Sequence, residues 1–65
     1  MYFLINYENR TKLGTFVGFF TFEANKEPLN VDPELLSLAA KDSNRINQVD
    51  GKVGSILITS INPVD

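Results

Sequence analysis

A run of β-branched and aromatic residues from Thr15 to Phe22 limits what this chain can fold into more than any other feature. Such residues fit the pleated surface of a sheet, and we predict a β-strand over residues 15–23. Side chains along a strand point alternately to its two faces. One face carries Phe16, Gly18, Phe20 and Phe22. Because the other face carries Val17 and Phe19, this strand is bulky on both sides, unlike a strand with one side in water.

The residues before this run predict a hairpin. Residues 2–8 read as a first strand, with Phe3, Ile5 and Tyr7 on one face. The polar stretch that follows ends at Gly14, so we predict a loop over residues 8–13 that joins the two strands.

A helix is predicted to begin just after Asp32. Asp32 is a favoured N-cap residue, Pro33 suits the first helical position, and Glu34 places negative charge in the first turn. An apolar arc then follows at helical spacing: Leu35, Leu36, Leu38, Ala39 and Ala40. Asp42 would intrude on this arc, so we expect the helix to end near Lys41.

The last third of the chain predicts a second hairpin. Asp50-Gly51 is a strong signal for a two-residue turn, with an entering strand over Arg45–Val49 and a returning strand over Lys52–Ile61. The expected fold is therefore α+β. It is a single two-layer ββαββ domain over residues 1–65, with an antiparallel sheet of two hairpins and one short helix packed on one face.

Composition argues against several classes of function. The chain of 65 residues contains no histidine and no cysteine, which removes the commonest general base, the usual activated nucleophile and most metal ligands. We therefore expect no catalytic residue, no metal site and no cofactor. A net charge of −2 argues against a nucleic-acid partner, which normally meets a basic surface. No segment resembles a signal peptide or a membrane span, so we expect a cytoplasmic protein without membrane contact.

One short helix can cover only one face of the sheet, so we expect the other face to be an interaction surface. Its candidate residues are Phe3, Ile5, Tyr7, Val17, Phe19, Ile56 and Ile58. The expected partners are a second copy, in a homodimer or a higher symmetric oligomer, and another protein. We expect a small non-catalytic protein-binding module or inhibitor that acts by occupying a surface, as many short proteins of phages and mobile elements do.

Two alternatives remain open from the sequence. One is a homo-oligomer that binds a small molecule, such as a nucleotide, in pockets between subunits. The residues that could line such a pocket are Tyr7, Arg45, Lys52, Gly54 and Ser55. The other alternative is a purely structural assembly subunit, because strands that are apolar on both sides suit packing between copies.

Overall fold

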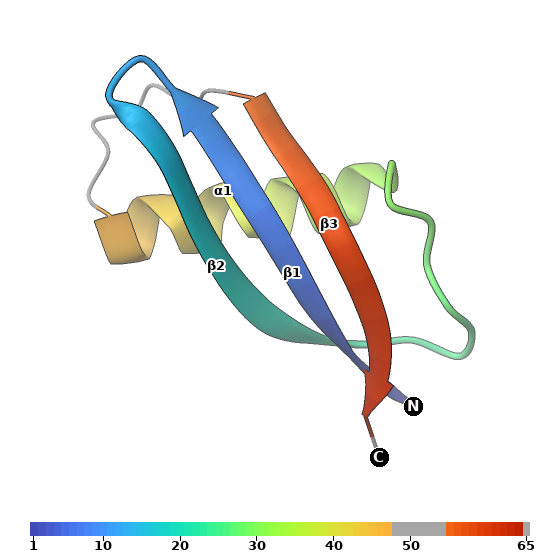
Figure 1. Cartoon of the computed structure of the whole chain (residues 1–65). Coiled ribbons are helices and arrows are strands. Elements are labelled where there is room, and N and C mark those ends of the chain that lie inside the picture. The colour runs from blue at the N-terminus through green and yellow to red at the C-terminus, as the bar shows by residue number, and fades with distance from the viewer. Residues whose placement is uncertain (48–54, 65) are drawn as a thin grey trace.

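The computed structural model describes residues 1–47 and 55–64, which form one three-stranded antiparallel sheet and one helix (Figure 1). The elements are β1 (Tyr2–Thr11), β2 (Gly14–Glu23), α1 (Pro33–Asn47) and β3 (Ser55–Val64). The strand order is β2-β1-β3, so the first strand is central. Helix α1 crosses one face of the sheet (Figure 1). The predicted α+β class, with an antiparallel sheet and a helix on one face, is confirmed.

The first hairpin is tighter than predicted. Strand β1 continues to Thr11, which pairs with Gly14, so only Lys12 and Leu13 form the turn. The Thr11 hydroxyl accepts from the Leu13 N–H at 3.1 Å and donates to the Gly14 carbonyl at 3.0 Å. Gly14 has a φ of 134°, which side chains disfavour. The predicted strand over residues 2–8 is confirmed, and the predicted loop is wrong at residues 9–11, which pair with β2 despite their polar composition.

The predicted helix start is confirmed. The Asp32 carboxylate accepts from the Glu34 N–H at 2.9 Å, which is the N-cap bond expected at this position. The Asp32 carbonyl accepts from the Leu36 N–H at 3.0 Å and so begins the helical hydrogen bonding. Pro33 is the first residue of α1.

The predicted helix end near Lys41 is wrong, because α1 continues to Asn47. Asp42 does turn toward the sheet, but it meets a polar partner there: the Tyr7 hydroxyl donates to its Oδ2 at 2.6 Å. A carboxylate that accepts a hydrogen bond can remain in a helix face that packs on a sheet. The predicted strand Arg45–Val49 is consequently wrong at residues 45–47, which are helical. Residues 48 and 49 and the predicted Asp50-Gly51 turn lie outside the described residues.

Strand β3 lies beside β1 on the side away from β2. The predicted strand Lys52–Ile61 is confirmed over residues 55–61, and β3 continues through Pro63. Proline is tolerated there because β3 is an edge strand. The register shifts between Asn6 and Tyr7, which pair with Ser60 and Ile58, so Thr59 forms a bulge between them.

The core lies between the sheet and α1. Its buried apolar side chains are Phe3, Ile5, Tyr7, Leu35, Ala39 and Ile58. The expectation that Phe3, Ile5, Tyr7 and Ile58 are exposed is therefore wrong. The register is the physical reason, since it pairs odd-numbered β1 residues with even-numbered β2 residues. The face of β1 that carries Tyr7 thus continues into the face of β2 that carries Gly18 and Phe20, and α1 covers both.

Tyr7 occupies the space that Gly18 leaves open on this face. The two residues are paired across β1 and β2, and a Cβ at Gly18 would lie 2.6 Å from Cζ and 3.0 Å from Cε2 of the Tyr7 ring. No real Cβ approaches an aromatic ring carbon as closely as the shorter distance. The ring also packs at 48° to that of Phe20, with centroids 6.1 Å apart. A glycine is therefore required opposite Tyr7.

We expect Gly18→Ala to lower the free energy of unfolding by about 1–3 kcal/mol, because the added methyl overpacks the core. The cost should be smaller in a Tyr7→Leu background, since the atoms that the methyl meets belong to the Tyr7 ring. Denaturant unfolding of the parent, the two single variants and the double variant measures this coupling. If Gly18→Ala lowers the free energy of unfolding equally in both backgrounds, contact with the Tyr7 ring is not the reason why a glycine is needed at position 18.

Candidate functional site

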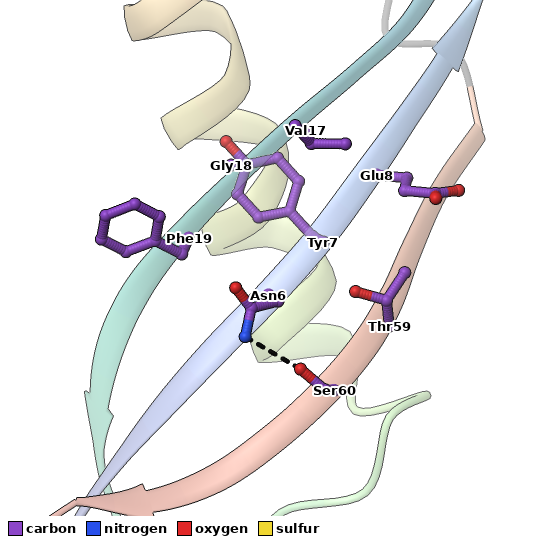
Figure 2. A pocket seen from close by; sticks show the side chains of 8 residues that line it. All are labelled: Asn6, Tyr7, Glu8, Val17, Gly18, Phe19, Thr59 and Ser60. Atoms are coloured by element: carbon purple, nitrogen blue, oxygen red, sulfur yellow. Dashed lines mark hydrogen bonds between the residues drawn. The ribbon is translucent and has the colours of Figure 1, made fainter.

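The sheet face turned away from α1, which we call the outer face, is the candidate site. It consists of the even-numbered residues of β1 from Tyr2 to Arg10, the odd-numbered residues of β2, and the residues of β3 that pair with that face of β1. Figure 2 shows its central part, with side chains from all three strands. Helix α1 lies on the opposite face, and no described helix or strand covers the outer face (Figure 1).

Large apolar side chains lie exposed along both margins of the outer face. Val17 and Phe19 on β2 are 70% and 65% exposed, and Leu57 on β3 is 45% exposed. Val17 and Leu57 lie in one row across the sheet, since both pair with Glu8 of the central strand. Phe19 occupies the next row, opposite Asn6. An aromatic ring so exposed on a sheet face is available to a partner.

Polar groups occupy the middle of the outer face. The Asn6 amide donates to the Ser60 hydroxyl at 2.8 Å (Figure 2). Glu8 and Arg10 form a surface ion pair with 3.3 Å between Oε2 and Nη2. Asn6 and Glu8 also line a shallow depression beside Val17 and Phe19. The face therefore combines apolar contact points with hydrogen-bonding groups held in place by their neighbours.

The predicted interaction residues divide between the two faces. Val17 and Phe19 are exposed on the outer face. Ile56 is partly buried against the core on the other face, together with the buried predicted residues named above. Sequence reasoning missed Leu57. The run Ile56-Leu57-Ile58 is uniformly apolar, and only its pairing with β1 shows that the middle residue alone faces outward.

The predicted ligand-binding residues are not brought together where the structure describes them. Tyr7 is buried under α1, whereas Ser55 is exposed at the start of β3 and pairs with Arg10 of the outer face. Arg45 lies in α1. Lys52 and Gly54 lie outside the described residues. The side chains of Tyr7 and Ser55 thus lie on opposite faces of the sheet.

A buried polar cluster joins β1 to the second half of α1, and the sequence analysis did not find it. Beside the bond between Tyr7 and Asp42, the Asn9 amide donates to the Ser43 hydroxyl at 3.0 Å. Asn9 and Ser43 are both fully buried, and Asn9 Oδ1 has no hydrogen-bond partner among the described residues. The paired residues are 35 and 34 positions apart in the sequence, so no local pattern could reveal them.

The described residues contain no group of three or more side chains able to hold a metal ion. Within residues 1–47 and 55–64, no helix is long and apolar enough to cross a bilayer. Comparisons with protein-family models, with curated proteins and with solved structures find no match for this chain.

We expect Ser43→Ala to lower the free energy of unfolding by about 1–3 kcal/mol, because it removes the acceptor of a buried amide. The double variant Asn9→Leu/Ser43→Ala should be closer in stability to the parent, since it leaves no polar atom of that pair buried. Thermal and denaturant unfolding of the three proteins tests this expectation. It fails if the double variant loses more stability than Ser43→Ala alone.

Proposed function

We propose that this chain is a small, non-catalytic protein-binding module that acts as an inhibitor by occupying the surface of another protein. The observation that carries the proposal is the pair Val17 and Phe19, which is largely exposed on the face that α1 leaves open. Neighbouring apolar side chains on an open face favour contact with a partner.

The composition of the outer face suits a protein partner. Binding energy in protein interfaces is concentrated in a few large side chains that enter pockets, surrounded by polar contacts that exclude water. Phe19 is the aromatic anchor of this face, and Asn6, Glu8 and Ser60 supply polar groups next to it. The partner we envisage presents an apolar cleft that receives Phe19.

The rest of the chain is consistent with a role that needs no chemistry. With no histidine and no cysteine, it lacks the usual catalytic side chains, and its net charge of −2 does not favour nucleic acid. Blocking an enzyme or a defence complex in the cytoplasm, as inhibitors encoded by phages do, requires only a surface that fits. We propose that the chain acts in the cytoplasm and in this way.

Affinity capture with a tagged chain tests this function, using lysate of the cells in which the protein acts. We expect one protein to be retained in near-stoichiometric amount by the parent and at least about tenfold less by Phe19→Ser, because an anchor residue contributes about 2 kcal/mol or more. Leu29→Ser is the matched control, since Leu29 is 71% exposed but lies in the linker before α1.

Circular dichroism should show that both variants keep the fold of the parent, since both positions are exposed. The proposal is wrong if no protein is retained in near-stoichiometric amount. It is also wrong if the Phe19→Ser variant retains the same amount of the partner as the Leu29→Ser variant.

A further inference from the structure

The two edges of the sheet differ in how they are protected against pairing with another strand. Edge strand β3 carries a bulge at Thr59 and a proline at position 63, and both devices hinder further pairing. Edge strand β2 has neither. It pairs with β1 without a register shift over its ten residues, and its only charged residue is Glu23 at its end. A long, regular, uncharged edge is a template for another strand.

The hydrogen-bonding groups that β2 presents at this edge follow from its pairing with β1. The Ala24 N–H donates to the Met1 carbonyl at 2.9 Å, just beyond the last residue of β2. Because backbone groups along a strand point alternately to its two sides, even-numbered β2 residues turn their N–H groups toward β1. Val17 and Phe19 therefore turn their N–H and carbonyl groups toward the edge at which no described strand pairs with β2.

We propose that β2 pairs antiparallel with β2 of a second copy, about a two-fold axis that passes between the two copies of Gly18, so that the two three-stranded sheets become one. A two-fold axis perpendicular to the sheet keeps both outer faces on the same side. Residues that pair across the axis must then both be odd-numbered or both be even-numbered. With Gly18 opposite the partner's Gly18, Val17 lies opposite the partner's Phe19, and Phe19 lies opposite the partner's Val17. Each pair joins an aromatic and a β-branched residue, a favourable cross-strand combination.

The rest of β2 is self-complementary in this register. Thr15 lies opposite the partner's Thr21, which is another favourable pair across strands. At the ends, Glu23 lies opposite the partner's Leu13, next to the partner's Lys12 in the hairpin turn. Glu23 and Lys12 are both exposed and opposite in charge. Since residues 14–22 carry no charge, no like charges face each other along the paired strands.

This inference goes beyond the proposed function and does not depend on it. Pairing at the β2 edge uses backbone groups and leaves the outer face open. It also places the Val17 and Phe19 side chains of both copies next to one another in the middle of the combined sheet. A partner protein would then meet twice the apolar surface that one chain presents.

Sedimentation equilibrium of the parent and two double variants tests both the interface and its register. We expect the parent to be a dimer at high micromolar concentration. V17K/F19K should dissociate at least about tenfold more readily, because like charges then face each other twice across the axis. V17K/F19E should remain dimeric, since opposite charges then face each other in the Gly18-centred register, and its association should weaken with added salt.

A second measurement needs no variant. In the parent, hydrogen exchange at the Val17 and Phe19 amides should slow as the protein concentration rises, because these N–H groups become bonded only in the dimer. The proposal is overturned if the parent is a monomer at high micromolar concentration. It is also overturned if the two variants associate equally, or if exchange at these amides is independent of concentration. A monomeric parent that still captures its partner refutes the dimer alone and leaves the proposed function intact.

Discussion

The contact of Tyr7 with Gly18 and Asp42 is the interaction on which the rest of this structure depends. The Tyr7 ring fills the space above Gly18 of the neighbouring strand, and the Tyr7 hydroxyl donates to the Asp42 carboxylate of α1. One side chain thereby ties β1, β2 and the helix together and determines which face of the sheet is inside. Once Tyr7 is inside, the alternation of side chains along β2 leaves Val17 and Phe19 outside.

The outer face follows from the size of the domain as much as from its sequence. A chain of 65 residues buries only about 60% of the surface that its unfolded form exposes. Its single described helix covers one side of the sheet, and no other described helix or strand covers the second side. The outer face of the central strand carries polar Asn6, Glu8 and Arg10 after Tyr2 and Leu4 at its start, whereas the edge strand β2 carries Val17 and Phe19. This uneven distribution is the reason why the proposed binding surface lies on the β2 side.

The sequence predicted correctly those features that depend only on residues close together in the chain. The β-branched and aromatic run predicted β2, and Asp32 with Pro33 predicted the start of α1, because strand preference and N-capping act over a few residues. The end of α1 could not be predicted in this way. Asp42 reads as a break in an apolar arc until its bond to Tyr7, 35 positions away, is known. Because the helix was predicted to end too early, residues 45–47 were wrongly predicted to form a strand.

The candidate site was predictable only in part for the same reason. Alternation showed that Val17 and Phe19 share a face, but it could not show whether Phe3, Ile5 and Tyr7 share that face too. The pairing of Tyr7 with Gly18 decides this, and pairing register is a long-range property.

Hydroxyl-radical footprinting of the purified, folded chain, with no other protein in the sample, tests the assignment of the two faces most directly. We predict fast modification of the Phe19 ring and protection of Phe3, an identical residue type on the opposite face, until the chain unfolds. This contrast should hold in the monomer and in an edge-paired dimer. Modification of Phe3 as fast as that of Phe19 in the folded protein would contradict the account.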